Sequence, residues 1–283
     1  MAMSKSTIGN EQRVEAGSGA AVVLVPGIQG RWEWMRATVE ALARRCRVIT
    51  FSHCGEPGSG VKLHAALGVD NFVRQIDAVL DRAGLERAAI CGISLGGLVA
   101  LRYAALRPAR VSALILVSVP GPRWRPDRVQ AFCARYWPIS PPVFAASAIA
   151  RLWREVIRAH GGLLRALPFA LVHVWRVLAH RASVWRMHQR YELWLAAREQ
   201  TDYAAIAAPT LIVTGERELD RVVPVEGTVE YARCIPGART ATLEGTGHIG
   251  LVTRPRAFAE MVAGFVEDAA RSRARGDSRS AAR

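Results

Sequence analysis

The chain has 283 residues, 51% of them hydrophobic, which is enough for one large α/β domain or for a core domain that carries an insertion. The net charge is +14, but Lys5 and Lys62 are the two lysines and arginine supplies the rest, as a GC-rich coding bias would produce. No nucleic-acid reader motif accompanies the charge, so we expect no nucleic-acid partner. The longest apolar stretch, Ala166 to Trp175, is too short to span a membrane.

The N-terminal segment and the cysteines bear on location and cofactors. Met1 to Gly19 is polar and lacks the apolar core of a secretory signal. The five cysteines are scattered, with no C-x-x-C pair and no histidine at metal-ligand spacing. We therefore expect reduced thiols and a cytoplasmic location, and neither a metal nor another cofactor.

Apolar runs rich in β-branched residues alternate with amphipathic segments, which is typical of a parallel sheet built from βαβ units. The predicted strands are Ala21–Val25, Arg47–Phe51, Ala88–Cys91, Ala113–Val117, Thr210–Thr214 and Arg239–Leu243. The predicted helices are Trp32–Arg45, Val69–Ala83, Leu95–Leu106, Val225–Cys234 and Pro255–Ala270. The chain therefore repeats strand and helix, with one interruption.

The interruption is the segment 122–203, where apolar residues recur at helical spacing and no strand signal occurs. It predicts a helical cap inserted between two parts of a core domain, 1–121 and 204–268. The cap contains six of the eight tryptophans, and thirteen arginines against five acidic residues. Residues 269–283 are basic and have few apolar side chains to bury, so we expect a disordered basic tail there.

The stretch Gly92-Ile93-Ser94-Leu95-Gly96 lies between a predicted strand and a predicted helix. This G-x-S-x-G pattern is typical of a nucleophile elbow, a sharp turn that leaves the serine side chain exposed at the helix N-terminus. The flanking glycines allow other segments to pass close to the turn. Ser94 is therefore the candidate nucleophile.

A serine hydroxyl needs a base, and the base needs an orienting carboxylate. His248, in Gly245-Thr246-Gly247-His248, lies in a glycine-rich loop at the carboxyl end of a predicted strand, where open α/β sheets build their sites. The loop after Thr210–Thr214 offers three carboxylates. Asp220 is our choice because it lies late in that loop, and Glu218 is the alternative.

The site also needs backbone N–H donors for a tetrahedral oxyanion. One is the amide of Leu95, directly after the serine. The second is expected from the glycine-containing loop Val25-Pro26-Gly27-Ile28-Gln29-Gly30 after the first strong strand, where Ile28 is the candidate.

Taken together, these four motifs make the chain resemble the α/β-hydrolase superfamily, in its capped esterase and lipase-like branch, over about residues 20 to 268. The resemblance implies a mostly parallel central sheet of six to eight strands flanked by helices, with an inserted helical cap. Three features depart from the family pattern: Pro26 replaces a histidine, the acid loop is longer by two residues, and the segment before Ala21 looks too short and polar for the usual two leading strands.

The resemblance implies a serine hydrolase that cleaves a carboxylic ester through an acyl-enzyme. Carbon–carbon bond hydrolases, lactonases, thioesterases and acyltransferases use the same triad and remain alternatives, as does a ligand-binding homologue without turnover. The expected partner is a small molecule, an apolar acyl or aromatic ester. We expect the tryptophans and leucines of the cap to form its own core with arginines outside, in preference to a peripheral membrane contact. The oligomeric state is not predicted.

Overall fold

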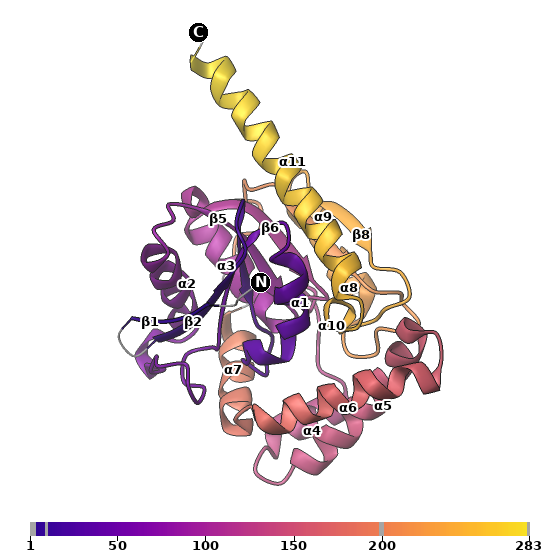
Figure 1. The fold of residues 1–283 in the computed structure, drawn as a ribbon. Helices are drawn as coiled ribbons and strands as arrows, with labels where there is room; N and C mark the ends of the chain where they lie inside the picture. Colours follow the sequence, from indigo (N-terminus) through magenta and orange to yellow (C-terminus); the bar gives the residue numbers. More distant parts are fainter. Residues whose placement is uncertain (1–3, 9–10, 198–200, 282–283) are drawn as a thin grey trace.

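The computed structural model describes residues 4–8, 11–197 and 201–281, with side chains over 13–195 and 201–275. A central sheet of eight strands has the order β1-β2-β4-β3-β5-β6-β7-β8 (Figure 1). The strands are β1 (Ser4–Ile8), β2 (Glu11–Ala16), β3 (Ala21–Val25), β4 (Arg47–Phe51), β5 (Ala88–Ile93), β6 (Val111–Val117), β7 (Thr210–Thr214) and β8 (Arg239–Thr242). The β1–β2 and β2–β4 pairs are antiparallel and the others are parallel, which confirms the predicted fold class.

The two leading strands, β1 and β2, were not expected, and that expectation is wrong. Among the described side chains of β2, 13–16, Val14 and Ala16 are buried, because a strand near the sheet edge needs few apolar side chains. Glu15 of β2 also pairs with Arg47 of β4 at 2.6 Å. A polar segment therefore forms a strand here through pairing with β4, which local hydrophobicity does not reveal.

Helices cover both faces of the sheet. The α-helices of the described chain are α1 (Arg36–Leu42), α2 (Asp70–Arg82), α3 (Leu95–Leu106), α4 (Arg128–Arg135), α5 (Pro141–His160), α6 (Leu163–Ala179), α7 (Val184–Ala197), α8 (Val225–Val229), α9 (Tyr231–Cys234), α10 (Gly250–Thr253) and α11 (Pro255–Ala281). Short 3-10 turns occur at Trp32–Met35, Ala65–Leu67 and Pro108–Arg110. Side chains of β3 alternate between two cores, since Val23 and Val25 pack with α2 and α3 while Val22 and Leu24 pack with α1 and α11.

The C-terminal helix differs from the prediction of a disordered tail over 269–283. Helix α11 continues to Ala281, and in Figure 1 its C-terminal part extends beyond the sheet. Buried side chains such as Phe258, Val262 and Val266 fix only its first half against the sheet. Once that half is docked, alanine and arginine extend the helix at little cost, so the absence of apolar side chains does not end it.

The predicted insertion lies between β6 and β7 and contains α4 to α7, with no strand among its described residues. In Figure 1 these helices gather at one end of the sheet. No single helix in the described chain has both the length and the apolar composition to cross a membrane; α6 and the Val184–Leu195 part of α7 would pass that test only as a pair, bent by 91°.

The order of the strands locates a crevice. The chain passes from β3 to β4 on one side of β3 and then to β5 on the other. Loops that leave the carboxyl ends of β3 and β5 therefore diverge, and open α/β sheets bind ligands at such a switch point. Here those loops carry Ile28 and Ser94.

Candidate active site

Ser94 forms the turn between β5 and α3. Its φ is +51°, a value that only one other described non-glycine residue approaches. A Cβ atom added at Gly92 would lie 2.6 Å from the backbone of Gly97, and one added at Gly96 would collide with the carbonyl oxygen of Pro26. The glycines therefore let α3 begin directly after β5, against the loop that follows β3, while Ser94 stays half-buried at the crevice.

His248 connects Ser94 to Asp220. Its Nε2 lies 3.1 Å from Ser94 Oγ, and its Nδ1 lies 3.3 Å from Asp220 Oδ2. An ionised carboxylate only accepts hydrogen bonds, so Nδ1 carries the proton and Nε2 is free to accept from the serine hydroxyl. The structure thus brings together the three residues that the sequence motifs single out, from the ends of three strands.

The charges of His248 and Asp220 stabilise one another. Burial raises the pKa of Asp220. The charge and hydrogen bond of His248 and the amides of Val222 and Val223 together lower this pKa by more than burial raises it, so it lies below its ordinary value. Burial lowers the pKa of His248, but the carboxylates of Asp220 and Glu155 raise it above its usual range. Asp220 is therefore ionised at neutral pH, as an orienting acid must be.

The three carboxylates of the acid loop have separate places. Asp220 is buried, and its Oδ1 accepts from the amides of Val222 and Val223, both at 3.0 Å, which leaves Oδ2 for His248. Glu216 instead accepts from the amide of Gly245 at 2.6 Å and so ties the acid loop to the histidine loop. Glu218 is exposed to solvent. The structure therefore places Asp220, and not the alternative Glu218, against the histidine.

The loop after β3 brings Ile28 beside the serine. A Cβ added at Gly27 would lie 3.4 Å from Ser94 Cβ, so this loop passes directly over the elbow. Within the described part of the chain, the amides of Ile28 and Leu95 donate to no other group. Both predicted donors are therefore available at the crevice.

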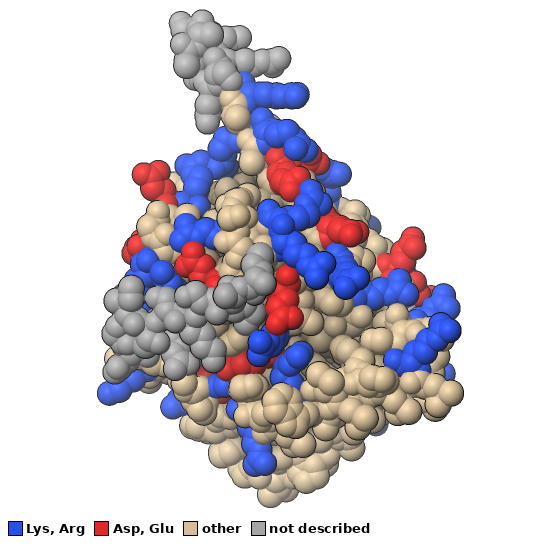
Figure 2. Space-filling view, viewed as in Figure 1, with Lys and Arg blue, Asp and Glu red and all other residues tan. Residues whose placement is uncertain are grey.

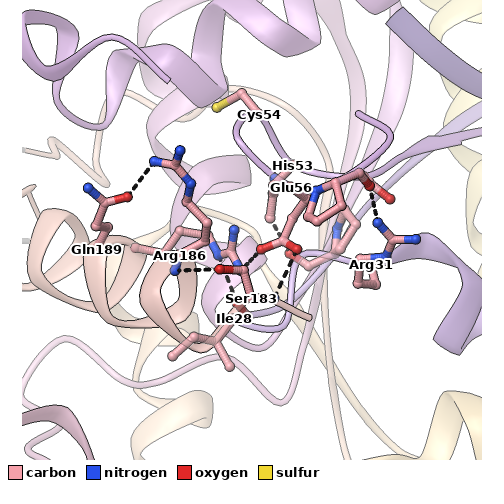
Figure 3. A network of polar contacts seen from close by, with 12 residues as sticks. Ile28, Arg31, His53, Cys54, Glu56, Ser183, Arg186 and Gln189 are labelled. Atoms are coloured by element: carbon pink, nitrogen blue, oxygen red, sulfur yellow. Dashed lines mark hydrogen bonds and ion pairs between the residues drawn. The ribbon is translucent and has the colours of Figure 1, made fainter. Parts of the chain in front are cut away.

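Buried side chains hold this loop in place of the family histidine that Pro26 replaces. His53 Nε2 donates to the carbonyl oxygen of Pro26 at 2.8 Å, and Arg190 Nε of α7 donates to the carbonyl oxygen of Ile28 at 2.7 Å. Glu56 binds Arg190 at 2.7 Å and accepts from the amide of Ser183. Figure 3 shows Ile28, Glu56 and Ser183 converging in this network.

Glu155 of α5 is a second buried carboxylate near His248. It accepts from the amide of Ile249 at 3.1 Å and from the hydroxyl of Thr253 at 3.4 Å. Burial raises its pKa to about 6, although the amides of Ile249 and Gly247 lower it. Neither Glu155 nor Arg190 was predicted as a site residue, because a single charged residue on an arginine-rich helical segment carries no local motif.

The insertion also contacts the acid loop. Gln130 Nε2 of α4 donates to the carbonyl oxygen of Val222 at 3.0 Å, and a guanidinium nitrogen of Arg151 donates to that of Arg221 at 2.7 Å. With Arg190 on the Ile28 loop and Glu155 on the histidine loop, helices of the insertion hold all three loops that surround Ser94.

A narrow apolar cavity adjoins the elbow beneath the insertion. Its volume is about 10 Å³, room for about one water molecule. It is lined by Leu95, Leu98, Pro120, Gly121, Trp124, Tyr191, Trp194 and Leu195. This cavity itself does not hold an acyl group larger than a methyl unless the side chains that line it rearrange.

The fold and this constellation define a hydrolase of the α/β type, and comparisons with known proteins agree. A family model described as the alpha/beta hydrolase fold matches residues 20–137. A protein of Azorhizobium caulinodans named "Putative carbamate hydrolase RutD" is 28% identical over 252 residues, which cover 88% of this chain and 92% of that protein.

Solved structures share the same fold. The enol-lactonase from Burkholderia xenovorans LB400 has a TM-score of 0.71 at 19% identity, with 90% of this chain and 95% of that chain covered. A serine hydrolase from Cycloclasticus zankles has a TM-score of 0.73 at 17% identity, with 94% and 98% covered. The chain therefore has the α/β-hydrolase fold.

Proposed function

We propose that the protein is a serine hydrolase that cleaves a carboxylic ester through an acyl-enzyme. The observation that carries this proposal is the hydrogen-bonded chain from Ser94 through His248 to Asp220. Ser94 Oγ attacks the ester carbonyl as its proton passes to His248 Nε2, and Asp220 stabilises the imidazolium that forms. The amides of Ile28 and Leu95 stabilise the oxyanion.

The second half of the reaction uses the same groups. The tetrahedral intermediate collapses, the carbon–oxygen bond to the leaving group breaks, and His248 gives its proton to the departing alcohol. Water, deprotonated by His248, then attacks the acyl-enzyme, and the carboxylic acid leaves as Ser94 regains its proton.

The cavity favours esters with an apolar acyl or aromatic group, because tryptophan and leucine side chains line it. Hydrolysis of a carbamate is the second candidate, since the curated relative just described carries that name. A carbamate has the same electrophilic carbonyl, so the triad serves both. The lining of the cavity is mainly apolar, which is why we place the ester first.

A small molecule is thus the proposed partner of the site. We also propose a cytoplasmic location; the five cysteines form no disulfide in the structure, which supports it.

The mechanism is tested with the hydrolysis of short p-nitrophenyl esters and with a fluorophosphonate label mapped by mass spectrometry. Ser94→Ala should lower kcat by about four to six orders of magnitude and abolish labelling. Asp220→Asn should lower kcat by about 10⁴-fold, while the matched change Glu218→Gln leaves it unchanged. A label on another residue, or equal losses in the two acid variants, would contradict the assignment.

The substrate class is tested separately with esters, lactones, thioesters, vinylogous diketones and carbamates at equal concentration. We expect kcat/KM to be highest for esters with an apolar acyl group. If carbamates are cleaved faster than esters and Ser94→Ala abolishes that cleavage, the assignment of the triad stands and a carbamate replaces the ester as the proposed substrate.

A further inference from the structure

Helix α6 exposes a broad apolar face to solvent. Leu164 is 82% exposed and Trp175 is 66% exposed. The face consists of Leu164, Leu167, Leu171, Trp175 and Leu178, which recur at helical spacing. We call these five side chains the α6 face.

This face contradicts the expectation that the tryptophans and leucines of the insertion form its own core. The opposite side of α6 already faces the protein: Ala166 is buried, and Phe169 packs on His160 of α5 with a ring separation of 4.6 Å. Because α6 has apolar residues nearly all round, one side packs inward and the other stays uncovered.

Helix α5 enlarges the apolar surface. Ile149 is 70% exposed and Trp153 is 49% exposed. In Figure 2 the lower part of the molecule, where α5 and α6 lie in Figure 1, is mostly tan, with blue side chains at its edges. Large apolar side chains exposed in this number on two neighbouring helices mark an interaction site and not an ordinary protein surface.

The exposed charges of α5 and α6 themselves have one sign, and the acidic side chains of Glu40 and Asp127 lie near Arg176 and Arg151. Glu155 is the acidic residue within Pro141–Ala179, and it is fully buried. The same range holds five arginines, and Arg154, Arg158 and Arg165 among them are exposed. Apolar side chains with tryptophan and a cationic border suit the boundary between acyl chains and anionic headgroups.

Two other occupants fit less well. In a symmetric dimer the same patch meets itself, so the arginine border would face a second arginine border. A membrane span through α6 and α7 would have to extract α7, whose Arg190 and Trp194 are buried against the core. The helix can lie on a membrane without either penalty.

We propose that the α6 face docks onto the surface of a membrane that contains anionic lipids. This inference rests on the exposed surface and its charges and does not depend on the proposed reaction. Docking would place the insertion, and therefore the route to Ser94, against an apolar phase.

Flotation of the full chain with vesicles tests the proposal. We compare phosphatidylcholine vesicles with vesicles that also contain phosphatidylglycerol, and expect binding to the second kind. Leu171→Glu/Trp175→Glu should weaken that binding at least about tenfold, since two large apolar side chains no longer enter the bilayer. The matched control Leu106→Glu/Val229→Glu changes two exposed apolar residues of α3 and α8 with the same charge and should bind like the wild type.

A truncation after Ala270 removes the basic end of α11 and should also leave binding intact. Thermal unfolding verifies that each variant is folded. The proposal is overturned if the wild type does not float with anionic vesicles, if the α6 variant floats as well as its control, or if the truncation alone abolishes binding. Sedimentation showing a wild-type dimer that Leu171→Glu/Trp175→Glu dissociates, without vesicle binding, would assign the face to a second copy.

Discussion

Glu155 adds a negative charge beside the proposed base, and its effect on pH dependence can be predicted. The neutral form of His248 accepts the proton, so activity falls as pH drops through its pKa, which Asp220 and Glu155 hold above the usual value. Glu155→Gln keeps an acceptor for the amide of Ile249 but removes the charge, so the pKa of His248 should fall. The acidic limb of kcat/KM against pH should therefore move to lower pH.

The control is Glu216→Gln, which neutralises a carboxylate that also touches the histidine loop but does not shift the pKa of His248. Its acidic limb should stay where the wild type has it. Equal shifts in both variants, or none in Glu155→Gln, would show that Glu155 has a purely structural role.

Arg190 positions the Ile28 loop, so its removal should affect the transition state. Arg190→Met leaves Glu56 buried without its partner and should cost about 3–5 kcal/mol of stability, measured by denaturant unfolding. The released Ile28 loop should lower kcat by about 10²–10³-fold, with KM little changed.

The double variant Arg190→Met/Glu56→Gln separates the two effects, because position 56 then carries no charge that lacks its partner. Stability should recover in part while kcat stays low, measured at a temperature where both variants are folded. Recovery of kcat together with stability would mean that Arg190 serves the fold alone.

The residues that the sequence predicts and those it misses differ in how they are encoded. Ser94, Asp220 and His248 each lie in a short loop after a strand, where glycines mark the turn and the chain order is fixed. Arg190, Glu56 and Glu155 meet the site only because separate helices pack over it. No spacing within one segment records that packing.

At the level of elements, the elbow depends on close contact between α3 and the loop after β3. Gly96→Ala would drive a Cβ atom into the carbonyl oxygen of Pro26, which is backbone and cannot swing aside. We expect a loss of about 1–3 kcal/mol in stability and a large loss of kcat, because the Ile28 loop is displaced.

The matched control is Gly264→Ala in α11, where an added Cβ atom meets nothing within 4 Å. It should stabilise the protein by about 0.5–1 kcal/mol and leave kcat unchanged. If Gly96→Ala behaves like Gly264→Ala in unfolding and kinetic measurements, the close approach at the elbow is not required.

The elements predicted well are those whose own residues determine them. The central strands are mostly apolar, because helices cover both of their faces, so their hydrophobicity identifies them. Strand β2 and the end of α11 instead depend on a neighbouring strand and on a docked first half. Such dependence on context is absent from the local sequence.

Across the whole molecule, the insertion is both the cover of the site and a support for it. Its helices hold the Ile28 loop through Arg190, the acid loop through Gln130 and the histidine loop through Glu155. The insertion also lines the apolar cavity beside the elbow, so a substrate that widens this cavity displaces the same helices. Entry and the alignment of the site are therefore coupled.

This coupling can be measured with a double-mutant cycle. Gln130→Glu keeps the side-chain oxygen that caps α4 but removes the donor to the carbonyl oxygen of Val222. Arg190→Met, a change in α7, removes the donor to the carbonyl oxygen of Ile28. The two side chains bind different loops and share no hydrogen-bond partner, so independent effects on kcat/KM should add within about 0.5 kcal/mol. If the insertion moves as one body, the first change already loosens it. The loss of kcat/KM in the double variant should then be smaller than the sum of the two single losses by more than this margin.

The control for this cycle pairs Arg190→Met with Arg45→Ala, which breaks a surface ion pair with Glu267 and should be additive. Additivity in both cycles would mean that each helix of the insertion acts on its own loop alone.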